Sequence, residues 1–87
     1  MSAEKYRKKP VEIEAIQFDG TNVMELIEWV GGSARYSGLD SFSELLIQTL
    51  EGEMHASLGD WIIKGTEGEF YPCKPAAFAA TFEKVES

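Results

Sequence analysis

This chain of 87 residues is poor in the side chains that hold metals and form crosslinks, with one cysteine and one histidine. A single cysteine, Cys73, excludes an internal disulfide and any cysteine-based metal cluster. His55 alone cannot build a site that needs several histidines. We therefore predict no metal, no cofactor, and a structural role for both residues.

Long apolar runs are also lacking. No run approaches the roughly 18 residues of a membrane-spanning helix, and no signal-peptide pattern follows Met1. We expect no membrane partner and a cytoplasmic location. The length fits one domain, residues 1–87, with a thin margin of buried surface. That margin, together with exposed strand edges, favours a homodimer.

Basic residues are few outside the N-terminus. The net charge is −7, but residues 1–10 carry +3 and the remainder of the chain carries −10. We expect residues 1–9 to form a flexible basic arm. The acidic body argues against general nucleic-acid binding, because that affinity comes mainly from neutralising phosphates.

The first half of the chain predicts a strand and a helix. Residues 11–18 alternate apolar and polar side chains, but the alternation changes phase near Ala15, which predicts a bulge or a sharp twist. Four apolar residues then repeat with helical spacing over residues 23–30, after an N-cap at Thr21 or Asn22. The pair Gly31-Gly32 ends this helix.

The second half predicts mostly strands. Residues 33–43 include residue types typical of loops, and a short strand at 34–36 is left open as an alternative. Strands at 44–50, 53–58, 61–64 and 69–72, joined by short turns, predict an antiparallel meander. A short helix at 76–80 and a closing strand at 81–85 follow. The predicted class is α+β: a curved antiparallel sheet or small half-open barrel with one covering helix.

Two adjoining motifs, GDWIIKG at residues 59–65 and GEFYPCKP at 68–75, carry a resemblance. With residues 6–15, 49–52 and 81–83 they are similar to a family of small proteins encoded by bacteriophages and prophages. Residues 23–43 lie outside the resemblance, and Ala76 stands where the family usually has an acidic residue. The resemblance implies a location in the host cell cytoplasm.

Catalytic chemistry is not indicated. Asp60, Glu67 and Glu69 lack the defined separation and environment of a catalytic carboxylate pair. Asp60 follows Gly59 in a turn, where its expected role is to hydrogen-bond the turn backbone. No Ser-His-Asp arrangement can be argued with one histidine. We predict that the protein is not an enzyme and has no catalytic residues.

Aromatic and basic residues near the predicted meander form a candidate ligand site. Rings can stack on a base and lysines can meet a phosphate, so the set suits a small nucleotide-like ligand. Its members are Trp61, Lys64, Tyr71 and Lys74, with Arg35 and Tyr36 closing over them. The alternative is that the aromatics are core residues and the lysines are surface residues.

Two functions follow as hypotheses. The first is a non-catalytic phage accessory protein that counters host defence by sequestering a small nucleotide-like signal. The second is an acidic inhibitor or adaptor that binds a basic face of a host or phage protein, with imitation of nucleic acid as one form of this role. Six glutamates would carry its surface: Glu12, Glu14, Glu25, Glu28, Glu51 and Glu53. A structural role in the virion or its assembly is a third option.

Overall fold

The computed structural model describes residues 3–5, 11–32, 34–36 and 44–85. Its elements run in the order β1 (Glu14–Gln17), α1 (Val23–Val30), β2 (Ala34–Tyr36), β3 (Glu44–Thr49), β4 (Gly52–Ser57), β5 (Trp61–Lys64), β6 (Phe70–Cys73) and α2 (Pro75–Thr81). The α+β class is confirmed. Within residues 33–43 the structure describes only β2, a short strand, because residues 33 and 37–43 lie outside the described part. Residues 1–2 and 6–9 of the expected basic arm also lie outside it.

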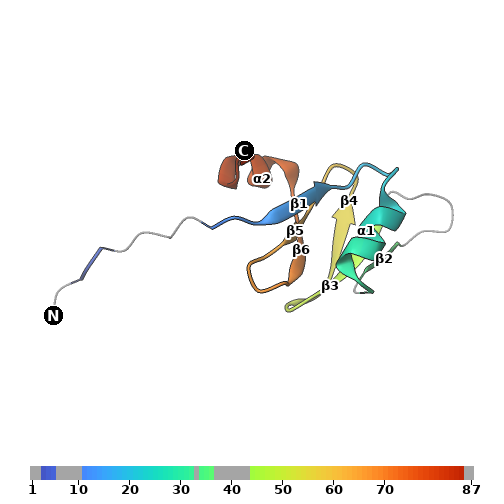
Figure 1. Cartoon of the computed structure of the whole chain (residues 1–87), viewed down its shortest axis with the longest axis horizontal. Coiled ribbons are helices and arrows are strands. Elements are labelled where there is room, and N and C mark those ends of the chain that lie inside the picture. The colour runs from blue at the N-terminus through green and yellow to red at the C-terminus, as the bar shows by residue number, and fades with distance from the viewer. Residues whose placement is uncertain (1–2, 6–10, 33, 37–43, 86–87) are drawn as a thin grey trace.

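The strands form two small antiparallel sheets, ordered β1-β5-β6 and β2-β3-β4 (Figure 1). Neither sheet is closed or strongly curled, so the prediction of one curved sheet or half-open barrel is wrong. Instead of rolling one sheet, the chain buries its apolar side chains between two sheets and a helix. The second helix, α2, corresponds to the short helix predicted at residues 76–80.

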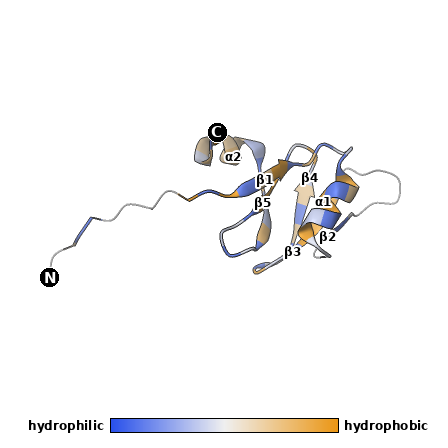
Figure 2. Cartoon of the chain, viewed as in Figure 1, coloured by the Kyte–Doolittle hydropathy of each residue, from blue (hydrophilic) through white to orange (hydrophobic). Residues whose placement is uncertain are grey.

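Helix α1 forms at the predicted residues because its apolar side chains fall on one face. Val23, Leu26 and Val30 are buried, whereas Met24 on the other side is exposed, and Figure 2 shows both hydrophilic and hydrophobic positions along this helix. Gly31 takes a φ of 75° and its N–H donates to the Ile27 carbonyl, which ends the helix.

One core joins the helix to both sheets. It contains Leu26 of α1, Leu45, Ile47 and Ala56 of β3 and β4, and Ile62 of β5, together with Phe18 just after β1. All but one of these side chains come from strands or α1, and Phe18 is fully buried among them. The two sheets are therefore halves of one packed unit.

Strand β1 is regular, so the bulge predicted near Ala15 is wrong. Its register with β5 is continuous from Glu14 opposite Lys64 to Gln17 opposite Trp61. The apolar residues change face because both faces of this sheet are covered. Ile16 packs against the core, whereas Ala15 and the preceding Ile13 line a cavity on the side of α2.

A bulge does occur, in the opposite strand. The N–H of Gly59 donates to the carbonyl of Phe18, while the N–H of Phe18 donates to the carbonyl of Asp60. Gly59 and Asp60 thus lie opposite the single residue Phe18, and Gly59 has a φ of 93°. This is the pattern of a G1 bulge. Here the chain leaves β4 and pairs with β1, so β3 to β6 do not form the predicted continuous meander.

The C-terminal residues also differ from the prediction. Helix α2 begins at Pro75, a favourable first helical residue, and ends at Thr81, one residue beyond the predicted range. Phe82 is extended, but residues 82–85 pair with no strand in the described part of the chain, so the closing strand at 81–85 is wrong. Alternation of apolar and polar residues does not show whether a neighbouring strand is available for pairing.

Candidate binding groove

A groove of about 500 Å³ lies between α2 with the residues that follow it and the extended segment that leads into β1. Its lining is mainly apolar, with three charged side chains among its residues. The lining residues are Val11, Glu12, Ile13, Ala15, Trp61, Phe78, Phe82, Glu83, Lys84 and Val85. This volume falls in the range of about 300–1,000 Å³ typical of ligand pockets.

Aromatic packing holds α2 over its sheet. The rings of Trp61 and Phe78 stack with centroids 4.1 Å apart and planes within 6°. The ring of Phe82 lies 5.1 Å from that of Phe78. Phe78 and Phe82 are four residues apart and so project from the same side of the chain as it leaves the helix. No residue of α2 is buried, so its position over the sheet depends on contacts such as the stacking of Phe78 on Trp61.

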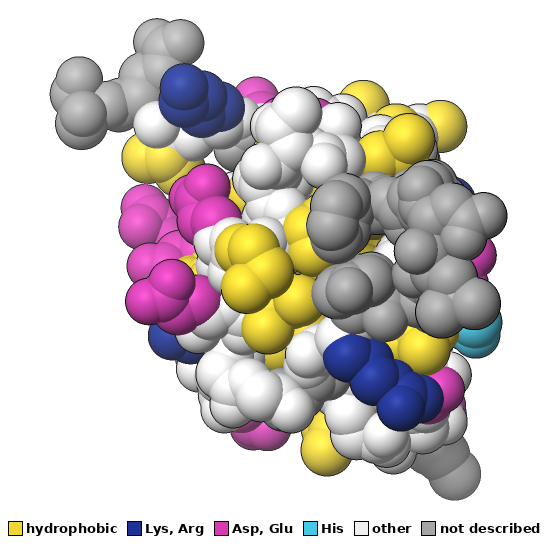
Figure 3. All heavy atoms as spheres, turned by 90° about the vertical axis from the view of Figure 1, so that its right-hand side faces the viewer, with side chains coloured by type: hydrophobic (Ala, Val, Ile, Leu, Met, Phe, Trp, Pro, Cys, Tyr) yellow, Lys and Arg dark blue, Asp and Glu magenta, His cyan; other side chains and the backbone are white. Residues whose placement is uncertain are grey.

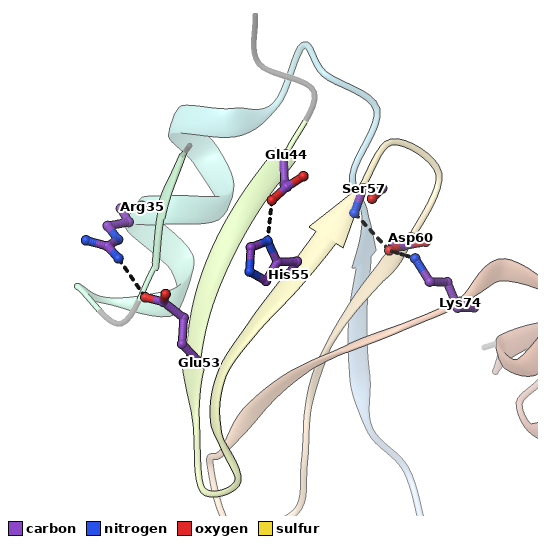
Figure 4. A network of polar contacts seen from close by, with 7 residues as sticks. All are labelled: Arg35, Glu44, Glu53, His55, Ser57, Asp60 and Lys74. Carbon is purple, nitrogen blue, oxygen red and sulfur yellow. Dashed lines mark hydrogen bonds and ion pairs between the residues drawn. The ribbon is translucent and has the colours of Figure 1, made fainter. Parts of the chain in front are cut away.

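The start of α2 is tied to the bulge by Asp60. This carboxylate is only 4% exposed, and its Oδ2 accepts from the Ser57 N–H and from the Lys74 Nζ, each at 2.8 Å (Figure 4). Lys74 immediately precedes the helix. Asp60 therefore stabilises the turn backbone, as the sequence predicts, and fixes the point from which α2 departs.

The structure disperses the residues of the predicted nucleotide site. Trp61 lines the groove, but Phe78 covers one face of its ring. Lys64 lines a different cavity beside Glu14, with its Nζ 5.9 Å from the centroid of the Phe70 ring. Tyr71 lines a third cavity, and Lys74 is held by Asp60. These four side chains do not converge on one ligand.

Arg35 lies on the other sheet. Its guanidinium donates to Glu53 at 2.8 Å, reaching from β2 over the middle strand β3 to β4 (Figure 4). It lines a cavity with Leu46 and Gln48 and does not line the groove. Tyr36 ends β2 on the same sheet, and its side chain lies outside the described part of the structure. Arg35 is therefore not placed to close over Trp61.

A cavity beside the β3–β4 turn contains Tyr71 together with the exposed Leu50 and Met54. Burial raises the pKa of the Tyr71 phenol, and the nearby charges of Glu69 and Cys73 act in the same direction. Tyr71 therefore stays neutral at ordinary pH and can donate a hydrogen bond, but none of the described lysines lines this cavity.

The chain's one histidine, His55, lies apart from the groove. His55 pairs with Glu44 on the outer face of its sheet, where both are solvent-accessible (Figure 4). Among the residues that the structure describes, no group of three or more His, Cys, Asp or Glu side chains could hold a metal ion.

The six glutamates of the predicted acidic surface are all exposed. They are spread over several elements: Glu12 and Glu14 at β1, Glu25 and Glu28 on α1, and Glu51 and Glu53 at the β3–β4 hairpin. Figure 3, seen from the side of α1, shows acidic side chains gathered along one margin of that face. Of the six, only Glu12 lines the groove.

Sequence reasoning did not identify the groove residues Val11, Ile13, Phe82 and Val85 as a site. Two patterns in the sequence pointed to them. The apolar residues of 11–15 alternate so that they lie on the sheet face opposite the core. Phe78 and Phe82 are four residues apart, the spacing of one helix face. Both signals indicate a second apolar layer on the outer face of the sheet.

Replacing Phe78 by alanine is expected to free α2 while the core stays folded. A helix of seven residues is unstable without packing, and Phe78 supplies the ring that stacks on Trp61. Hydrogen exchange should show lost protection at residues 78–82 and unchanged protection in β3. Phe78→Leu, which keeps apolar bulk, is the matched control and should retain most protection. Full protection of α2 in Phe78→Ala would contradict this account of its attachment.

No helix in the described part of the chain is long and apolar enough to cross a membrane. Comparison of the chain with protein-family models, with curated proteins and with solved structures gave no significant match.

Proposed function

We propose that this protein is a non-catalytic inhibitor or adaptor that receives an apolar side chain, carried on a basic segment of another protein, in the groove beside α2. The observation that supports the proposal is the lining of the groove. Trp61, Phe78 and Phe82 offer aromatic surface, and Val11, Ile13 and Val85 complete an apolar wall. Buried aromatic contacts of this kind dominate the affinity of many protein interfaces.

The charges at the groove favour a basic partner. Among the described residues that line it, Glu12 and Glu83 stand against one cation, Lys84, and the body beyond residue 10 carries −10. An acidic field of this kind attracts a cationic segment and speeds its encounter. A lysine or arginine flanking an inserted apolar side chain would meet these carboxylates.

The same chemistry disfavours the sequestration of a nucleotide-like signal, which stays a prediction from the sequence. A phosphate entering the groove would meet two carboxylates, while Lys64 and Lys74 lie elsewhere with other contacts. The bacteriophage resemblance is compatible with either function, because both describe a small protein that engages a host component in the host cytoplasm.

The proposal can be tested with a short synthetic peptide in which one phenylalanine is flanked by lysines. Its binding should shift the NMR signal of the Trp61 indole N–H. The Trp29 indole is an internal reference, because Trp29 lies on α1 and packs edge-to-face against Phe70 beside the core. Peptides with serine in place of phenylalanine, or glutamate in place of lysine, should bind at least about tenfold more weakly.

Charge reversal at the groove supplies the matched control. The double variant Glu12→Lys/Glu83→Lys should weaken binding of the lysine peptide about tenfold. Glu25→Lys/Glu28→Lys, which changes the net charge equally but lies on α1, should have a much smaller effect. Equal effects of the two variants, or no shift of the Trp61 signal, would refute the proposal. A Trp61 shift produced by nucleotides and not by the peptide would favour sequestration instead.

A further inference from the structure

The chain itself contains a segment with the chemistry that the groove should bind. In its first ten residues Tyr6 stands between Lys5 and Arg7, followed by Lys8 and Lys9. An aromatic side chain flanked by cations is the partner segment described above, so this inference rests on the proposed function. The segment also carries the +3 charge that opposes the −10 of the body.

The chain leaves the body at the groove. Val11, the first described residue of the body, lines the groove, and so does the neighbouring Glu12. Residues 3–5 are exposed and lie away from both sheets, at one end of a long axis of 58 Å (Figure 1). These residues therefore do not fold back over the groove of their own chain.

We infer that a second copy of this chain supplies the occupant: residues 4–9 of each copy enter the groove of the other. Because each arm begins at the edge of its own groove, two grooves that face each other across a two-fold axis bring each arm directly to its partner's groove. Six residues in extended form reach about 20 Å, enough to run along a groove of this size. The contact is self-complementary, as a two-fold dimer requires.

Two kinds of contact would stabilise the exchange. Tyr6 would place its ring beside Trp61 and Phe82, where aromatic pairs add to the burial of apolar surface. Lys5 and Arg7 would meet Glu12 and Glu83, and these exposed pairs would weaken as salt is added. A partner protein with a similar segment would then compete with the arm.

The test uses the full-length chain and two charge-reversed variants. The arm variant is Lys5→Glu/Arg7→Glu, and the groove variant is Glu12→Lys/Glu83→Lys. Sedimentation should show a dimer for the unmodified chain, with dissociation increased by salt. Each variant alone should dimerise about tenfold more weakly, since arm and groove would then carry the same sign.

An equimolar mixture of the two variants should restore dimers. The acidic arm of one variant meets the basic groove of the other, and the basic arm of the second meets the acidic groove of the first. Native mass spectrometry, with one variant isotopically labelled, should find heterodimers in preference to homodimers. Recovery of dimers in the mixture would show that each variant alone dimerises weakly because its arm and groove have like charge. A variant that had lost its fold would not recover.

The outcomes also separate this inference from the proposed function. A monomer at every concentration, or a dimer that neither variant weakens, would overturn the exchange of arms. If the lysine peptide still shifts the Trp61 signal in that case, the proposed function stands without it. If the peptide also fails to bind, both are refuted.

Discussion

Replacing Phe18 by alanine is expected to lower the free energy of unfolding by about 3–5 kcal/mol. Phe18 is fully buried and packs in the core that unites α1 with both sheets. Removing its ring would leave a cavity among residues of several elements, which cannot all close in at once. A small domain has only about 5–15 kcal/mol of stability, so this loss would bring the variant close to unfolding.

Urea denaturation followed by circular dichroism measures this effect. Met24→Ala is the matched control, because Met24 is also a large apolar residue but is 69% exposed. Its substitution should change the free energy of unfolding by no more than about 0.5 kcal/mol. Similar losses in the two variants would mean that Phe18 does not occupy the core position described above.

The second large effect is expected for Asp60→Ala, at about 2–3 kcal/mol. This substitution removes the buried carboxylate that accepts from the Ser57 N–H and from Lys74. It disturbs the short connection through which the chain passes from β4 of one sheet to β5 of the other. The bulge hydrogen bonds to Phe18 depend on the same turn, so their geometry should also loosen.

Lys74→Ala separates the two parts of this contribution. The Lys74 side chain is 68% exposed, so solvent screens its ion pair, and we expect its loss to lower the free energy of unfolding by about 1 kcal/mol or less. The Ser57 N–H would still bond to Asp60 in that variant. Equal losses for Asp60→Ala and Lys74→Ala would show that the ion pair, rather than the turn, carries the stabilisation.

Local patterns in the sequence were sufficient to predict the elements. The helical spacing over residues 23–30 and the glycine after it specify α1 without any knowledge of its neighbours. The strands of β3 to β6 were likewise predicted within one or two residues, because turns at glycine and alternation of apolar residues are properties of adjacent positions.

The assignment of strands to sheets could not be predicted in this way. The turn between Ser57 and Trp61 is as short as a hairpin turn, but it carries a bulge whose partner is Phe18, far away in the chain. The apolar residues of the first strand likewise make sense only once both faces of its sheet are known to be covered. Both features depend on tertiary contacts, which a local sequence pattern does not reveal.

The candidate site, like the fold, could be predicted only in part from the sequence. The sequence shows aromatic residues and lysines whose chemistry suits a ligand, but chemical type does not place them together. Trp61 and Lys64 are three residues apart on one strand, and alternation puts such residues on opposite faces. The groove instead combines residues from the two ends of the chain, which only the fold brings together.

The pairing of β1 with β5 also sets the order in which this protein can fold. Strands β3 and β4 are joined by a two-residue turn, so their hairpin requires only local motion. Strand β1 must wait for β5, which lies far along the chain at residues 61–64. The entropy of closing that loop is lost before its contacts give any gain. On the ribosome, β1 therefore stays unpaired until β5 emerges.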